Sequence, residues 1–307
     1  MLDKVAIGSD FQSEPRWIST DPDVAGEKFN RQSFEVSHRL SSHPLFQLPK
    51  LLELAERTVR SRPDDLYFDM GQVRTGQRWD QIPEAKFSAV EAMQQLESSD
   101  AWFLFRHTQR DPEYRELFDR GLKEIKEITG NCVDAHIRQE DILIFVTSPK
   151  RVTPYHIDRE CNFLLQIRGT KTIHVFDRED RDLLPEEEIE RFWAVDNNAP
   201  VFRPEYQDRA TSYKMTPGSG VHIPVNFPHW VQNDDNISVS LSVNFQFLDS
   251  MRANLYRSNY YLRKLGLKPS PPGLHHTRDA AKSFAMSCAL AARRIIRRGH
   301  RGDRIWN

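Results

Sequence analysis

Cysteine is scarce in this chain of 307 residues, and the few cysteines lie far apart. Cys132, Cys161 and Cys288 are an odd number at wide spacings. A disulfide framework needs cysteines in pairs, and a cysteine-rich zinc site needs closely spaced ones. The sequence therefore argues against both kinds of cross-link.

An excess of charge and long apolar runs are also missing. The chain has 43 Lys and Arg against 44 Asp and Glu, a formal net charge of −1, whereas bulk nucleic-acid binders carry a clear basic excess. No run approaches the roughly 18 apolar residues of a membrane span. The opening sequence MLDKVAIGSD lacks the apolar core of a secretory signal. We therefore expect a cytoplasmic protein with no membrane partner, and nucleic acid is disfavoured as a partner.

Helical patterns dominate the first part of the chain. The first thirty residues, rich in Asp, Ser and Pro, predict a loosely ordered arm. Proline opens two of the predicted helices, which suits a first helical turn because the missing N–H has no partner there anyway. The predicted elements are helices over 49–61, 83–96 and 111–128 and a strand over 101–106.

From about residue 141 the hydrophobic pattern changes to that of strands. Short β-branched or aromatic runs alternate with turn residues, which predicts an all-β core of roughly one hundred residues. Helical patterns return after residue 249, so helices flank the core at both ends. This arrangement indicates a mainly β barrel or sandwich. The predicted strands are Ile142–Val146, Asn162–Ile167, Thr172–Phe176, Ser212–Met215 and Ile237–Phe247.

The last predicted helix carries a narrow apolar seam. Its apolar residues recur at alternating spacings of three and four, a pattern used for helix pairing. The seam either packs on the chain's own β core or forms a homodimer. Its members are Ala281, Phe284, Cys288, Ala291 and Ile295.

Two clusters of opposite charge cancel in the net charge. Six arginines against Asp303 give the C-terminal tail +5, and residues 177–191 carry eight acidic and three basic residues, or −5. Cations are favoured at a helix C-terminus without any partner, and the acidic run at 186–190 is typical of a solvated helix. The clusters can also pair with each other or meet separate partners. The arginines are Arg293, Arg294, Arg297, Arg298, Arg301 and Arg304.

The densest chemical motif is VTPYHID at residues 152–158. Residues i and i+2 of a strand point to the same face, so His156 and Asp158 can converge on one ion. Two histidines and one carboxylate suit Fe(II) and leave positions free for substrate and O₂. A third ligand must then come from further along the chain.

A hairpin with the two-residue turn Gly169-Thr170 is predicted after this motif. It places Lys171 on an inward, largely apolar face, which is costly unless the ammonium meets an anion. Lys171 therefore pairs with a structural carboxylate, reaches solvent at the rim, or holds a cosubstrate that carries a carboxylate. His174 falls on the opposite face and is predicted to be a packing histidine. The face of Lys171 also contains Asn162, Leu164, Gln166, Ile173 and Val175.

Two histidines qualify by residue type as the third ligand. His222 lies in PGSGVHIP, and His229 lies in FPHWVQN, just before the long predicted strand. That position would place His229 at a barrel rim. The residues alone favour His229 only slightly over His222.

Taken together, the motifs resemble a known enzyme family. TPYHIDRECNFLLQIRGTK, IPVNFPHWVQN and SLSVNF are similar to the JmjC and cupin-like Fe(II)- and 2-oxoglutarate-dependent dioxygenases. The pattern is closest to the branch that contains the asparaginyl hydroxylase acting on hypoxia-inducible factor. The resemblance covers roughly residues 140–250. It implies a double-stranded β-helix (jelly-roll or cupin) over 101–250, an N-terminal arm and helices over 1–100, and C-terminal helices over 251–307.

The resemblance also implies roles for individual residues. His156, Asp158 and His229 would be the iron ligands, and Lys171, fifteen positions after His156, would hold the distal carboxylate of 2-oxoglutarate. The hydroxyl of Thr153 would assist Lys171, although Thr153 has the wrong strand parity to share a face with His156. The amides that would line the cosubstrate and metal pocket are Asn162 and Asn244.

The implied activity is oxidative. The enzyme would use Fe(II), 2-oxoglutarate and O₂ to hydroxylate or oxidatively demethylate a substrate, a small molecule or a protein side chain, with release of succinate and CO₂. One alternative is a non-catalytic cupin-like module that binds a metal or ligand for regulation. A sugar isomerase or epimerase of the cupin type would need no 2-oxoglutarate, and the spacing of Lys171 and Asn162 disfavours it.

Overall fold

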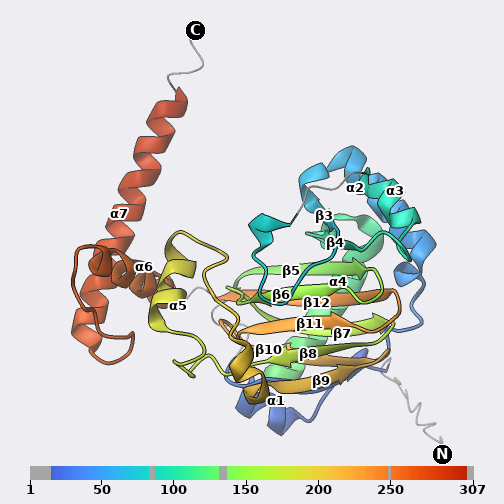
Figure 1. Cartoon of the computed structure of the whole chain (residues 1–307), viewed down its shortest axis with the longest axis horizontal. Coiled ribbons are helices and arrows are strands. Elements are labelled where there is room, and N and C mark those ends of the chain that lie inside the picture. The colour runs from blue at the N-terminus through green and yellow to red at the C-terminus, as the bar shows by residue number, and fades with distance from the viewer. Residues whose placement is uncertain (1–14, 83–86, 131–136, 248–249, 303–307) are drawn as a thin grey trace, which may run out of the picture.

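Two antiparallel sheets form the body of the protein (Figure 1). The structure is a computed structural model, and it describes residues 15–82, 87–130, 137–247 and 250–302. The eight-stranded sheet has the spatial order β1 (Ile18–Ser19), β2 (Phe34–His38), β10 (Ser219–Ile223), β7 (Cys161–Arg168), β12 (Ser238–Phe247), β5 (Ile137–Thr147), β4 (Ala101–Phe105), β3 (Leu66–Met70). The four-stranded sheet has the order β6 (Val152–His156), β11 (His229–Asn233), β8 (Lys171–Val175), β9 (Thr211–Met215).

Helices lie between these strands in the chain and also follow the last strand. Pro112 and the N-cap carboxylate of Asp111 begin α4, and Gly130 ends it. The helices are α1 (Pro22–Lys28), α2 (Leu48–Ser61), α3 (Ala89–Gln94), α4 (Pro112–Thr129), α5 (Glu186–Ala194), α6 (Ser250–Lys264) and α7 (His276–Gly302).

Side chains of the large sheet face two separate cores because they alternate along each strand. Phe163 and Leu165 of β7 face the main core, which Tyr114 of α4 also enters. Leu164 faces the small sheet and packs with Ile173 of β8. Two facing antiparallel sheets with helices on the outer side confirm the predicted mainly β, jelly-roll class of fold.

The predicted hairpin at Gly169-Thr170 is wrong. β7 pairs with β10 and β12 in the large sheet, whereas β8 pairs with β11 and β9 in the small sheet. The turn therefore crosses from one sheet to the other. Gly169 has a φ of +72°, and a Cβ there would lie 2.1 Å from the side-chain oxygen of Asn236. Leu164 and Ile173 still share the inner core, but they do so from opposite walls.

Residues 15–30 are more regular than the predicted loose arm. β1 joins the large sheet, and α1 begins after Asp21, whose side chain accepts a hydrogen bond from a backbone N–H of its first turn. The carboxylate of Glu124 in α4 accepts hydrogen bonds from the backbone N–H groups of Trp17 and Ile18 at 2.7 and 2.8 Å. Burial of these contacts outweighs the polar composition that predicted disorder. Residues 1–14 lie outside the described part.

Other boundaries also differ from the predictions. The helix expected over 83–96 begins only at Ala89, where Ser88 and Glu91 form a capping box, and residues 83–86 lie outside the described part. Strands β2, β3, β10 and β11 lie where no strand was predicted. The division of the chain at residues 100 and 250 stays a prediction, and Cys132 lies outside the described residues.

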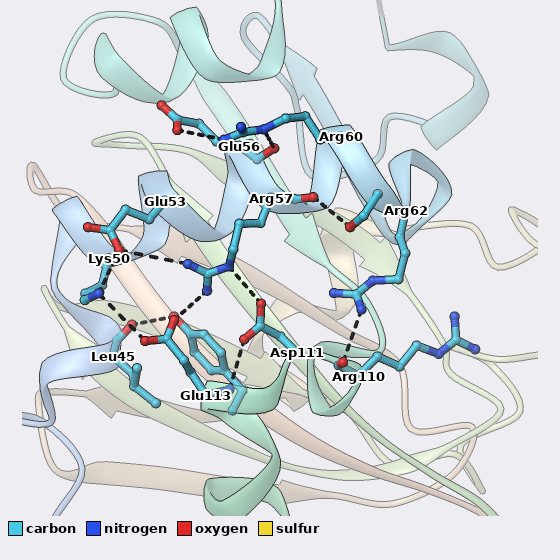
Figure 2. Close-up of polar contacts among 12 residues, drawn as sticks. Leu45, Lys50, Glu53, Glu56, Arg57, Arg60, Arg62, Arg110, Asp111 and Glu113 are labelled. Atoms are coloured by element: carbon cyan, nitrogen blue, oxygen red, sulfur yellow. Dashed lines mark hydrogen bonds and ion pairs between the residues drawn. The ribbon is translucent and has the colours of Figure 1, made fainter.

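Ion pairs join α2 to the beginning of α4 (Figure 2). The guanidinium of Arg57 lies 3.0 Å from the carboxylate of Asp111 and 2.7 Å from that of Glu113. Nearby, Arg62 donates a hydrogen bond to the backbone carbonyl of Arg110 at 3.1 Å. These contacts hold the segment that connects β4 to α4.

The acidic helix α5 is less solvated than predicted. Glu190 is fully buried, and its carboxylate pairs with Arg263 of α6 at 2.6 Å. Glu188 is also buried and pairs with Arg203 at 2.5 Å. The charge run therefore ties α5 to α6 and to the loop that follows α5.

Helix α7 extends away from the body of the protein (Figure 1). The seam residues Ala281, Phe284, Cys288 and Ala291 are exposed, and Phe284 is 72% exposed. Of the two alternatives for these four residues, packing on the chain's own β core is therefore wrong. The side chains from Arg294 onward, including Ile295, lie outside the described part. Within the described residues, no helix is long and apolar enough to cross a membrane.

Candidate active site

Three of the predicted site residues meet at one end of the small sheet. His156 ends β6, His229 begins β11 directly opposite it, and Asp158 follows two residues after His156. The Asp158 carboxylate lies 3.9 Å from Nε2 of His156 and 3.6 Å from Nε2 of His229. One ligand atom from each residue lies within 4.8 Å of the others, a spacing that suits a single metal ion.

Backbone carbonyls set the orientation of both histidine rings. Nδ1 of His156 lies 2.7 Å from the carbonyl of Pro154, and Nδ1 of His229 lies 2.9 Å from that of Phe227. With the proton on Nδ1, each Nε2 carries a lone pair toward the carboxylate of Asp158. Burial, together with a smaller contribution from the neighbouring His156, lowers the pKa of His229 to about 4. The neutral ring that a metal requires is therefore the favoured form.

His222 lies on the other side of the large sheet. It is fully buried, where Nε2 accepts a hydrogen bond from the backbone N–H of Asn30 at 2.9 Å and Nδ1 lies 2.9 Å from the carbonyl of Asn162. Its ring packs against Phe163 with centroids 4.6 Å apart. Burial lowers the pKa of His222 to about 3. The geometry makes His222 a structural histidine and leaves His229 beside Asp158.

A β-bulge removes the parity problem at Thr153. His229 is opposite His156, but Val231, two residues on, is opposite Thr153, three residues back. The extra residue on β6 turns both Thr153 and His156 toward the cavity. Pro154 lies inside the bulge and has no N–H to donate. The Thr153 hydroxyl accepts a hydrogen bond from Nε1 of Trp102 at 3.2 Å.

Lys171 lies deep between the two sheets. It is 5% exposed, and its Nζ donates to the hydroxyl of Ser240 at 2.6 Å. Burial lowers its pKa to about 7. Among the described residues no carboxylate forms an ion pair with it, and burial is the only cause of the lowered pKa. Of the three alternatives for this lysine, a structural carboxylate and a solvent-exposed rim are therefore both excluded within the described part.

A row of polar residues crosses the large sheet opposite the histidines. Asn244 of β12 is in register with Asn162 of β7 on one side and with Asp141 of β5 on the other. Asn162 is only 6% exposed. Its Oδ1 atom is buried and has no hydrogen-bond partner among the described residues. The hydroxyl of Ser242 donates to Asn244 Oδ1 at 2.8 Å. The row is therefore poised to bind a polar group that enters the cavity.

The triad, Thr153, Lys171 and the polar row line one cavity of about 700 Å³. No sequence motif marks its aromatic wall, in which the ring centroids of Trp79 and Trp102 lie 5.0 Å apart and those of Trp102 and Tyr67 lie 5.8 Å apart. Asn233, whose side-chain amide donates to the hydroxyl of Thr147 at 2.6 Å, was not among the predicted site residues either. Asn233 stood in the FPHWVQN motif, but the tryptophans lie outside any motif and only the folded chain brings them to the site.

His174 lies as its strand parity predicts, whereas the apolar lining expected from Leu164, Ile173 and Val175 is confirmed only for Leu164. His174 faces away from the cavity and stacks on Trp230, with ring centroids 4.3 Å apart. Leu164, Ile173 and Val175 belong to the core between the two sheets. Of these three, Leu164 reaches the cavity wall.

A model of a cupin-like domain family matches residues 58–251. The match covers more than half of the chain and includes the two sheets' central strands and every residue of the site. The chain therefore belongs to the cupin-like domain family. No curated protein sequence matches the chain.

Solved structures share the fold at low sequence identity. An X-ray structure of Escherichia coli YcfD superposes with a TM-score of 0.52 at 15% identity, over 90% of this chain and 68% of that one. A structure of YcfD described as a ribosomal oxygenase from Escherichia coli, in complex with cobalt and 2-oxoglutarate, gives 0.49 at 16% identity, over 90% and 67%. The first of these supports the jelly-roll fold.

Proposed function

We propose that this protein is an Fe(II)- and 2-oxoglutarate-dependent oxygenase that hydroxylates or oxidatively demethylates its substrate. The observation that carries the proposal is one cavity that joins a His-Asp-His triad to a buried lysine without a carboxylate partner among the described residues. The donor set fits Fe(II), because two imidazoles and one carboxylate on one side leave open positions. The buried ammonium fits an anion, since burying an unpaired charge is costly.

The distance between the lysine and the triad suits 2-oxoglutarate. Lys171 is opposite Asn233, four residues along β11 from His229, which is about 13 Å of backbone at the rise of a strand. A lysine side chain and a five-carbon dicarboxylate together span such a gap. Lys171 would hold the distal carboxylate by a charge-assisted hydrogen bond. Thr153, whose oxygen already accepts from Trp102, keeps its own hydrogen free to donate to the same carboxylate.

Other residues would orient the reacting end and keep water out. Asn162 and Asn244 would bind the 2-oxo acid end and groups near the metal, and Leu164 would shield the site from solvent. When bound, Fe(II) and 2-oxoglutarate supply the activation of O₂. The residues of the chain would then bind 2-oxoglutarate, orient it and exclude water from the site.

Succinate formation tests the proposal. Purified protein with Fe(II), ascorbate and 2-oxoglutarate is expected to form succinate, and His156→Ala or Asp158→Ala is expected to abolish it. His174→Ala, a histidine that faces away from the cavity, is the matched control and should keep the activity. Absence of 2-oxoglutarate binding in calorimetry with metal present would overturn the assignment. Binding without succinate formation would favour the non-catalytic regulatory module.

A further inference from the structure

One side of the cavity is not closed by a pair of facing strands. Nε1 of Trp102 in β4 donates to the hydroxyl of Thr153 in β6 at 3.2 Å, so β6, the edge strand of the small sheet, faces β4. The large sheet continues beyond β4 to β3, and Tyr67 of β3 also lines the cavity. Since the small sheet ends at β6, none of its described strands lies opposite β3. Segments outside the two sheets must therefore complete the wall on this side.

Residues 75–81, which we call the flap, lie along this open side. The carbonyl of Thr75 accepts a hydrogen bond from the backbone N–H of Tyr155 in β6 at 2.8 Å, so the flap begins at the free edge of the small sheet. Trp79 lines the cavity, and its ring meets that of His156 edge-on with the centroids 6.0 Å apart. The flap therefore covers the cavity beside a predicted metal ligand.

One arginine joins the flap to the loop that follows α5. Nη1 and Nη2 of Arg78 donate to the carboxylate of Asp196 at 3.2 and 3.1 Å, and Nη1 also donates to the carbonyl of Asn198 at 3.0 Å. Nε and Nη2 donate to Asp80 within the flap at 3.0 and 2.7 Å. All five N–H donors of this guanidinium are therefore used. The backbone N–H of Trp79 adds a hydrogen bond to the side chain of Asn198 at 3.2 Å.

The loop after α5 is itself held in place from the side of the triad. Asn197 and Asn198 both line the cavity. Arg159, the residue after Asp158, donates to the carbonyl of Phe192 at 2.8 Å and to the side-chain oxygen of Asn197 at 2.9 Å. The loop therefore has a fixed position relative to the predicted metal ligands, and Arg78 joins the flap to it.

The contacts that hold the flap are polar and partly exposed. The side chain of Arg78 is 36% exposed, that of Asp80 is 54% exposed, and Trp79 is only half-buried. Ion pairs at such exposure stabilise a structure only a little, and salt screens them. The sheets that form the other walls are held by continuous strand pairing and buried cores. The flap is therefore the part of the wall that can open at the lowest cost in free energy.

We propose that the flap is a gate on the cavity and that Arg78 is the positioning residue that keeps it closed. In the closed form Trp79 covers the triad beside β6. When Arg78 parts from Asp196, the flap turns outward and lets the metal ion and 2-oxoglutarate enter or leave. The identity of the molecule that passes rests on the proposed function, whereas the closure rests only on the contacts of Arg78.

A gate has a kinetic signature that a binding residue lacks. Arg78 is separate from the triad and from Lys171, so loss of its contacts should destabilise the closed form equally with and without bound 2-oxoglutarate. A change that acts equally on both states cannot shift the binding equilibrium. Association and dissociation should therefore speed up by the same factor, and the affinity should stay constant.

The rate at which 2-oxoglutarate is released tests this inference. Mn(II)-loaded protein carries 2-oxoglutarate, and glutamate dehydrogenase with ammonium and excess NADH consumes each molecule that is released. Arg78→Ala is expected to raise the release rate roughly 3- to 10-fold and to leave the affinity in calorimetry within about twofold. Asp196→Asn should act in the same direction, and Arg78→Lys should restore part of the closure. Added salt should speed release from the wild type but not from Arg78→Ala.

Arg57→Ala is the matched control. The side chain of Arg57 is also 36% exposed and also pairs with two carboxylates, those of Asp111 and Glu113, but it joins α2 to α4 (Figure 2). None of these three residues lines the cavity. Arg57→Ala should therefore leave the release rate and its salt dependence unchanged.

The outcomes separate the gate from the proposed function. An unchanged release rate in Arg78→Ala would overturn the inference, and so would an affinity that weakens in proportion to the rate. Release of Mn(II) into excess chelator, without 2-oxoglutarate, passes the same gate and should also be faster in Arg78→Ala. If 2-oxoglutarate does not bind to the wild type, the proposed function fails and the release of Mn(II) alone decides whether the gate exists.

Discussion

The affinity for 2-oxoglutarate should depend on pH through Lys171. The side chain is 5% exposed, and burial alone lowers its pKa from 10.5 to about 7. A distal carboxylate binds the ammonium form, so it raises this pKa again and the protein takes up a proton on binding. The lowered pKa means that the ammonium is present below pH 7 and is lost as the pH rises through 7. The affinity should therefore be level below this pH and fall above it.

The size of the effect follows from the fraction of Lys171 that is protonated. With a pKa of about 7, half of the lysine is charged at pH 7 and about 1% at pH 9, so the affinity should fall roughly 50-fold between them. Calorimetry with Mn(II)-loaded protein measures the affinity. Repeating it in buffers with different enthalpies of ionisation counts the proton, which should approach one per site at pH 9.

Two controls isolate the lysine. 2-Oxopentanoate has the same 2-oxo acid end without the distal carboxylate, so its affinity should change little over this range of pH. Lys171→Met, which keeps the length of the side chain, should bind 2-oxoglutarate weakly and without the slope. A level affinity of the wild type for 2-oxoglutarate from pH 7 to pH 9, or an equal slope for 2-oxopentanoate, would refute the reasoning.

Two further predictions concern stability and assembly. His222→Ala should lower the free energy of unfolding by about 3–5 kcal/mol, because it leaves two backbone groups unpaired and opens a cavity against Phe163. His174 is only partly buried, so His174→Ala should lower the free energy of unfolding by less than about 1 kcal/mol in denaturant titrations. A loss as large as that of His222→Ala would contradict this account. The exposed seam of α7 predicts a dimer in light scattering, and a chain ending at His276, or Phe284→Asp, should be monomeric. A monomeric full chain would exclude this use of the seam.

Much of the β core could be predicted from the sequence because its strands are short runs of β-branched and aromatic residues. Parity along those strands also placed Leu164 and Ile173 in one core. The partner strands could not be predicted in this way, since Gly169-Thr170 looks the same whether it closes a hairpin or crosses between sheets. The pairing of β7 in one sheet and β8 in the other shows which turn forms.

The candidate site could also be predicted only in part from the sequence. The spacing of His156 and Asp158 predicted their proximity, although β6 ends at His156 and Asp158 lies in the loop after it. The choice between His222 and His229 needed the resemblance, because either histidine could bind a metal. Thr153 contradicted simple parity, since a bulge on β6 is invisible in the sequence. Asp141 and the tryptophans Trp79 and Trp102 come from strands and loops with no motif, so their places in the cavity lining depend on tertiary packing alone.

Strand β6 has an unusual position for a strand that carries a metal ligand. It lies at the outer edge of the small sheet and pairs with β11 only, across a ladder that the bulge interrupts. A metal held by His156 and His229 would therefore cross-link this edge strand to β11 beside the bulge. Amide hydrogen exchange should speed up in β6 first when the metal is removed, while the eight-stranded sheet stays protected. Metal binding would then order the pairing of β6 with β11 locally, as a step separate from folding of the rest of the chain.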